Sequence, residues 1–226
     1  MECPDRRHAG PTPTERRPII AGRDLGGRRG VTTMRIGALE VAVVSDGLLN
    51  LDPQRLFGRV DEAVWRPVAG MDEHGHVPAG VNCALVRSGD RKILLDTGTG
   101  TALAAERGQA CGRLLESLAA LGTSPDEIDT VVVSHAHWDH VGGASIRSGD
   151  RWVPTFPSAS YWFWRGEWEY WTNPELPDRP PFLDDVLPPL VEHNRLGLLR
   201  NAVGAGHTVT PVDPAINNKF VLVSID

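Results

Sequence analysis

One stretch decides how this sequence folds: Asp129-Thr-Val-Val-Val-Ser134, followed directly by His135-Ala-His-Trp-Asp-His140. Its first half is a β-branched run of the kind that forms a buried strand. Its second half holds four candidate metal ligands within six residues: His135, His137, Asp139 and His140. Imidazole nitrogen and carboxylate oxygen are the donors that bind borderline-soft divalent metals. The stretch therefore predicts a buried strand that ends in a metal-binding loop.

The spacing of the four candidate ligands favours two metal positions. In an extended segment His135 and His137 project to the same side and can bind one ion, whereas Asp139 and His140 lie on the turn that follows, nearer a second ion. Gly142 and Gly143 come next and allow a close backbone approach that a side chain would block. The alternative is a polar loop or a set of hydrogen-bonded core histidines. Because so dense a cluster rarely arises by chance, the metal site is favoured.

Periodicity and turn residues predict an alternating α/β order around this stretch. We expect strands at 39–45 and 158–163, a hairpin of 81–87 with 92–96 turned at Ser88-Gly-Asp90, and a long surface loop over 52–80. Helices are expected within 111–122, after a cap at Ser124, over 166–171, and, interrupted by proline, over 184–190. The expected fold class is therefore α/β, or α+β in some schemes.

Composition narrows the class of protein. The 226 residues are 41% hydrophobic, which suits one folded domain. From Met34 onward, 16 basic residues face 25 acidic ones, and such an acidic body argues against nucleic acid as a partner. Three widely spaced cysteines indicate neither a disulfide framework nor a cysteine metal site. Without an apolar run long enough for a signal or a membrane span, we expect a cytoplasmic protein that does not contact the membrane.

The chain divides near residue 33. Residues 1–33 carry seven arginines against four acids, with proline and glycine and no apolar periodicity. We expect this segment to be a disordered extension, or a spurious one if translation begins at Met34. A basic tail that touches anionic partners is the functional alternative. Residues 34–226 form the expected domain.

The motif Ser134-His-Ala-His-Trp-Asp-His-Val-Gly-Gly143 resembles the signature of metallo-β-lactamase-fold hydrolases. The similarity is to the branch that contains N-acyl-homoserine-lactonase-like and methyl-parathion-hydrolase-like enzymes. Other stretches that agree are 41–47, the hairpin 82–87 into Leu94-Leu-Asp-Thr-Gly98, and 156–161 before a Trp-rich helix. The resemblance covers about residues 34 to 200.

This resemblance implies an αββα sandwich that binds two zinc ions, with other divalent metals also able to bind. His135 and His137 would bind the first ion and Asp139 and His140 the second, while Asp96 would accept a hydrogen bond from a ligand imidazole. The implied function is hydrolysis of a lactone, ester or phosphotriester by a metal-activated bridging water. Asp139 would also steer that water, which makes it the candidate catalytic residue. The expected partner is a small-molecule substrate, and homodimerisation is left open.

The sequence also departs from the family pattern. The family has a further Gly-His segment, a bridging Asp and a final His, and the candidate for the first of these is His207 in Ala205-Gly-His-Thr208. We therefore expect a C-terminally truncated domain whose second half is incomplete, and metal ions short of ligands, which argues against activity. Two alternatives stay open: an inactive metal-binding remnant of such an enzyme, and a mononuclear-iron oxidative enzyme on the same fold.

An aromatic cluster follows the motif. Five of the seven tryptophans lie between Trp152 and Trp171. Trp162, Trp164 or Trp168 could line a substrate pocket, pack in the core or form an interface patch.

Overall fold

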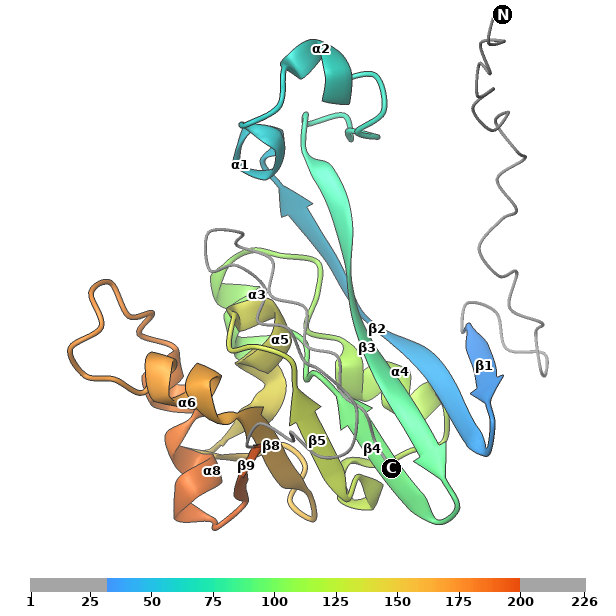
Figure 1. Ribbon diagram of the computed structural model, residues 1–226, viewed down its shortest axis with the longest axis vertical. Helices are drawn as coiled ribbons and strands as arrows, with labels where there is room; N and C mark the ends of the chain where they lie inside the picture. The colour runs from blue at the N-terminus through green and yellow to red at the C-terminus, as the bar shows by residue number, and fades with distance from the viewer. Residues whose placement is uncertain (1–31, 200–226) are drawn as a thin grey trace, which may run out of the picture.

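A seven-stranded mixed sheet is the frame of the protein in the computed structural model, which describes residues 32–199 (Figure 1). Its strand order is β1-β2-β3-β4-β5-β8-β9. The strands are β1 (Thr33–Ile36), β2 (Leu39–Leu51), β3 (Val77–Ser88), β4 (Arg91–Leu95), β5 (Thr130–Val133), β8 (Ser160–Trp164) and β9 (Leu196–Leu199). A separate two-stranded ribbon is formed by β6 (Ser145–Ser148) and β7 (Arg151–Pro154).

The sheet changes from antiparallel to parallel at β4. Strands β1 to β4 pair antiparallel, while β4, β5, β8 and β9 pair parallel to their neighbours. The carboxyl ends of parallel neighbours meet at one edge of a sheet, where α/β proteins commonly build their sites. Asp96, directly after β4, and Ser134, directly after β5, are therefore brought side by side although 38 residues separate them.

Helices and turns cover one face of this sheet and enclose the main core. Tyr161 and Leu94 on the strands are fully buried there, together with Leu118 on α4. The helical elements are α1 (Pro53–Phe57), α2 (Glu62–Trp65), α3 (Thr101–Glu106), α4 (Leu114–Ala120), α5 (Trp138–Val141), α6 (Arg165–Trp171), α7 (Leu183–Val186) and α8 (Pro188–Glu192), with single 3-10 turns at η1 (Pro125–Glu127) and η2 (Gly142–Ala144).

The opposite face of the sheet carries a smaller apolar cluster. Val132 of β5 lies there with Val86 and Ile93, whereas Val131 and Val133 face the main core. A strand with apolar side chains on both faces has a continuous apolar sequence rather than an alternating one. This explains the β-branched run at 130–133, and the prediction of a buried strand is confirmed.

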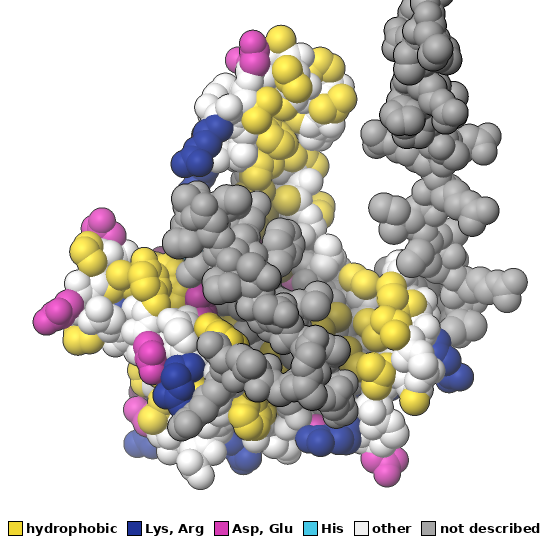
Figure 2. All heavy atoms as spheres, viewed as in Figure 1, with side chains coloured by type: hydrophobic (Ala, Val, Ile, Leu, Met, Phe, Trp, Pro, Cys, Tyr) yellow, Lys and Arg dark blue, Asp and Glu magenta, His cyan; other side chains and the backbone are white. Residues whose placement is uncertain are grey.

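Strands β2 and β3 run beyond the rest of the sheet and carry α1 and α2 at their far end (Figure 1). The extended parts of these two strands, together with α1 and α2, are called the arm. Trp65 is buried against Phe57 within this arm, with ring centroids 5.3 Å apart. Other apolar side chains remain exposed on it, as Figure 2 shows. They are Leu48, Leu56, Val60, Val64 and Val68. The prediction of one long loop over 52–80 is therefore wrong, because the arm contains two capped helices and the first residues of β3.

Most other predicted elements are present. The β3–β4 hairpin turns at Ser88-Gly-Asp90, and Ser124 forms a capping box with Glu127. Local sequence did not indicate α3, the β6–β7 ribbon or β9. Between residues 32 and 199 no helix is long and apolar enough to span a bilayer. The expectations for residues 1–31 and for His207 fall outside the described residues.

Candidate metal centre

The metal motif occupies the loop between β5 and α5, and Asp96 holds this loop in place. Ser134 donates its backbone N–H to Asp96 Oδ1 at 2.7 Å and its hydroxyl to Oδ2 at 2.8 Å. Asp96 has a φ of +61°, a left-handed conformation that Asp adopts more readily than most residues. The carboxylate at the end of β4 therefore fixes the position of Ser134, the first residue of the motif.

Asp96 also orients an imidazole, as the resemblance implied. His140 Nδ1 lies 2.8 Å from Asp96 Oδ2. Because a carboxylate can only accept, Nδ1 donates and Nε2 is directed away toward Asp139. A carboxylate that fixes the tautomer and ring orientation of a histidine is the arrangement found behind metal-ligating histidines.

The distances within the motif suit pairs of metal ligands. Two ligands about 2.1 Å from one ion at the tetrahedral angle lie about 3.4 Å apart. His140 Nε2 and Asp139 Oδ2 are 3.4 Å apart. His135 Nε2 and His137 Nδ1 are 3.0 Å apart, slightly closer. The residues predicted to share an ion therefore turn donor atoms toward each other.

The described residues do not complete a site. Between residues 32 and 199, no group of three or more His, Cys, Asp or Glu side chains is arranged so that it could hold a metal ion. The imidazoles of the motif instead pack on one another, with centroids of His135 and His140 4.0 Å apart. The donor types and their orientation by Asp96 fit a divalent metal, but each ion would need at least one further ligand.

Burial and neighbouring charges separate the pKa values of the histidines. Burial, with the nearby charges of His140 and His137, lowers the pKa of His135 to about 4. Burial acts to lower the pKa of His140 as well, but hydrogen bonds with Asp139 and Asp96 outweigh it and raise the pKa to about 9. For Asp139, burial is outweighed by the hydrogen bond and charge of His140, so its pKa is lowered.

These shifts predict how the stability of the metal-free protein depends on pH. The raised pKa of His140 contributes stability that is complete below about pH 6.5 and is lost as the pH rises toward 9. The lowered pKa of His135 contributes stability that is lost as the pH falls from about 6.5 toward 4. The contribution of this pair is therefore greatest near pH 6.5. In urea unfolding of chelator-treated protein, we expect His140→Gln to remove the alkaline loss but not the acidic one. An alkaline loss of equal size in the variant would contradict the assignment.

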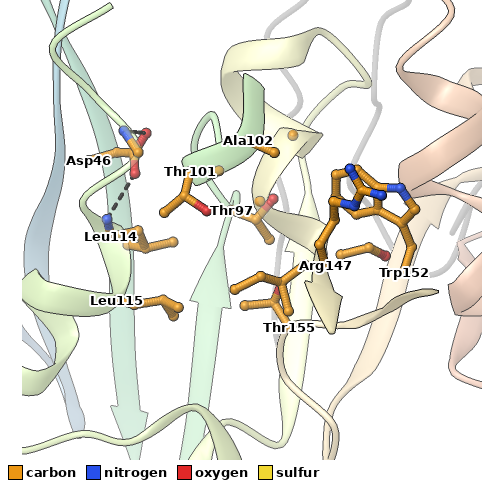
Figure 3. Close-up of a pocket in the computed structure, with 15 residues that line it drawn as sticks. Asp46, Thr97, Thr101, Ala102, Leu114, Leu115, Arg147, Trp152 and Thr155 are labelled. Carbon is orange, nitrogen blue, oxygen red and sulfur yellow. Dashed lines mark hydrogen bonds between the residues drawn. The ribbon is translucent and has the colours of Figure 1, made fainter. Parts of the chain in front are cut away.

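Asp46 is a buried residue behind the motif that the sequence analysis missed. Its carboxylate is fully buried and accepts three backbone N–H groups, two of which Figure 3 shows as dashed lines. The donors are Thr99 at 2.8 Å, Gly112 at 3.1 Å and Leu114 at 2.9 Å. Asp46 thus ties the loop after β4 to the start of α4. Its sequence context, Asp-Gly after an apolar run, reads only as a turn.

The glycines after the motif allow close approach, as predicted. A Cβ on Gly142 would lie 2.2 Å from the carbonyl oxygen of Thr99, and one on Gly143 would lie 2.1 Å from that of Thr97. Both distances are far below van der Waals contact. The loop after β4 therefore packs directly on the backbone that follows the motif.

The aromatic cluster divides between the core and the metal motif. Trp168 packs against the core and meets Phe163 edge-on, with centroids 5.2 Å apart. Trp162 packs with the smaller cluster on the other sheet face. The ring that touches the motif is instead Trp171, whose centroid is 5.7 Å from that of His137. Trp171 also donates to the buried Glu167, a second residue that the sequence analysis missed.

A cavity of about 170 Å³ lies between the β6–β7 ribbon and the starts of α3 and α4 (Figure 3). Leu114, Leu115, Ile146 and Trp152 give it apolar walls. None of the four motif ligands lines it, although Gly142 and Gly143 do. This cavity is therefore separate from the metal motif.

Comparison with known proteins gives a family and a fold. A sequence profile of the metallo-beta-lactamase superfamily matches residues 41–226. A search of curated proteins gave no match. Similar solved structures include AidC, described as a dizinc quorum-quenching lactonase in complex with the product N-hexanoyl-L-homoserine (26% identity, TM-score 0.60, 76% of this chain and 61% of that chain).

Two further structures share the fold at lower identity. They are AbOPH, a hydrolase in the beta lactamase superfamily (23% identity, TM-score 0.61, 77% of this chain and 62% of that one), and a probable metal-dependent hydrolase from Staphylococcus aureus (21%, 0.62, 74% and 60%). The chain thus spans about three fifths of the length of the structures it matches. With the profile covering most of the sequence and the motif at the end of β5, the chain belongs to the metallo-beta-lactamase superfamily.

Proposed function

We propose that this protein is a metal-dependent hydrolase of a lactone, ester or phosphotriester. The observation that carries the proposal is the motif geometry: His140 Nδ1 is bound to Asp96, and its Nε2 lies 3.4 Å from Asp139 Oδ2. The likeness to AidC supports the lactone within this substrate class. Two zinc ions are the proposed cofactor.

A divalent metal bound at such a site supplies a water of lowered pKa and polarises the scissile bond. The residues of the chain would bind the metal and orient the attacking water. His135, with its pKa of about 4, is neutral at pH 7 and offers a lone pair. Asp139, with a lowered pKa, is ionised and is the residue that we expect to orient the attacking water. His140 must lose a proton to become a ligand, so metal affinity should rise with pH.

A metal-binding protein without turnover is the second candidate. It is favoured by the lack of a three-ligand group among residues 32–199. A catalytic zinc normally has three protein ligands and an open position, so two pairs of ligands could bind metal weakly without activating water.

The metal content and turnover of the purified full chain test both candidates. We expect about two zinc ions per chain and hydrolysis of at least one of three probes: an N-acyl-homoserine lactone, an aryl ester and an aryl phosphotriester. Chelator treatment should remove the turnover, and added zinc should restore it. Less than one metal per chain without turnover would contradict the hydrolase and support the second candidate. Bound iron would instead indicate oxidative chemistry.

A further inference from the structure

Glu167 is a buried carboxylate that connects α6 to the metal motif. Glu167 lies in the first turn of α6, and it is only 6% exposed. One oxygen, Oε1, accepts both the backbone N–H of Ala136 at 2.9 Å and the indole N–H of Trp171 at 2.6 Å. Ala136 lies between His135 and His137, so this bond acts at the midpoint of the first ligand pair.

The second bond of Glu167 reaches the same histidine pair by another route. The ring of Trp171 packs edge-on against His137, with centroids 5.7 Å apart and planes at 72°. By holding the indole, Glu167 fixes the surface against which that imidazole rests. The backbone before His137 and the ring beside it are therefore both set by one carboxylate.

The rest of α6 makes this connection rigid. Trp168, one residue after Glu167, packs on Phe163 of β8 in the main core. The helix is thus anchored to the sheet, and the hydrogen bond from Ala136 to Glu167 holds the metal-motif loop against this anchored helix. Side chains held in this way keep the atoms of a site at a defined separation.

A buried carboxylate is costly, and an apolar side chain could fill the same space. What an apolar side chain could not do is accept the Ala136 N–H, whose partner here is Glu167. Nor could it place negative charge near His135, whose imidazole would bind the cation. The charge of Glu167 does act on His135. Both effects favour a metal-binding conformation of the loop.

We propose that Glu167 is a positioning residue for the first metal: its carboxylate fixes the separation of His135 and His137 and adds negative charge near His135. This role rests on the metal binding in the proposed function. It is distinct from ligation, because Glu167 acts through the Ala136 backbone and the Trp171 ring. A purely structural role, in which Glu167 only stabilises α6, predicts that the affinity for the metal and the spectrum of the bound metal do not change when Glu167 is replaced.

The test compares Glu167→Leu and Glu167→Gln with the matched control Glu169→Gln. Glu169 lies on the same helix, is 62% exposed and pairs with Arg165. The full chain is titrated with Co²⁺ in competition with a chromophoric chelator, and the d–d absorption spectrum is recorded. We expect Glu167→Leu to weaken Co²⁺ binding by about 10- to 100-fold, the usual effect of losing a partner behind a ligand, and to change the spectrum. Glu167→Gln, which keeps an acceptor but loses the charge, should show a smaller loss, and Glu169→Gln none.

The results also separate this proposal from the proposed function. Unchanged affinity and spectrum in Glu167→Leu, or in Glu167→Gln if the leucine variant does not fold, would overturn the positioning role. A wild-type chain that binds no Co²⁺ or Zn²⁺ would overturn the proposed function instead. In that case hydrogen exchange of the Ala136 amide still tests the contact. It should be at least about tenfold faster in the Glu167 variants than in Glu169→Gln, and equal rates would contradict the proposal.

Discussion

His135→Ala is expected to lower the zinc affinity of the protein by at least about a hundredfold and to abolish any hydrolytic turnover. Losing a partner behind a ligand already costs about 10- to 100-fold in affinity, and loss of the ligand itself should cost more. The effect should be large because His135 is packed against both other histidines of the motif, with centroids 4.6 Å from His137 and 4.0 Å from His140. Competition with a chromophoric chelator measures the affinity, and the three hydrolysis probes measure the turnover.

His74→Ala is the matched control for this variant. His74 lies on the arm outside the motif, with 71% of its side chain exposed and Glu73 as its acidic neighbour. It should therefore bind no metal of functional importance, and its loss should leave affinity and turnover unchanged. If both alanine variants retained the affinity of the wild type, the motif would not be the metal site.

Asp46→Ala is expected to lower the free energy of unfolding by roughly 3–5 kcal/mol, which is a large part of the stability of an ordinary domain. The fully buried carboxylate accepts three backbone N–H groups, and alanine would leave all three without their acceptor. Metal affinity should also fall. Asp46 holds the loop after β4, and this loop begins at Asp96, which orients His140. Urea unfolding measures the first effect.

Two further variants define the cause of this loss. Asp46→Asn keeps one acceptor oxygen but turns an NH₂ group toward a donor, so a smaller loss is expected. Asp90→Ala removes a carboxylate from the exposed β3–β4 turn and should change stability by no more than about 0.5 kcal/mol. A loss below about 1 kcal/mol in Asp46→Ala would show that water can replace the carboxylate.

The elements that could be predicted from the sequence are those with local causes. The turn at Ser88-Gly-Asp90 and the cap at Ser124 are made by neighbouring residues, so their sequence signals are complete. The β6–β7 ribbon has no such signal, and its position depends on contacts with α7 and α8. The arm was missed for a related reason: its two helices are only five and four residues long, too short for a periodic pattern.

The residues of the candidate site also differ in whether the sequence reveals them. The four candidate ligands lie within six residues, and their donor types are evident from sequence. Asp96 came from the family resemblance, and the structure places it against His140. Glu167 and Asp46 gave no signal, because an acidic residue in a first helical turn or before a glycine usually faces solvent. Their backbone donors lie 31 residues away for Glu167 and 53 to 68 residues away for Asp46.

The sequence by itself predicted the strand β5 and the candidate metal-binding residues of the loop that follows it, since both depend on contiguous residues, and the motif carried the resemblance to the superfamily. Only the tertiary structure decided which buried carboxylates hold that loop. Parallel pairing of β4 with β5 brings Asp96 to Ser134 and His140, and docking of α6 brings Glu167 to Ala136. The physical reason is that a carboxylate becomes a fixed acceptor only once folding has removed water and supplied its donors, and those donors come from segments that the chain order keeps apart.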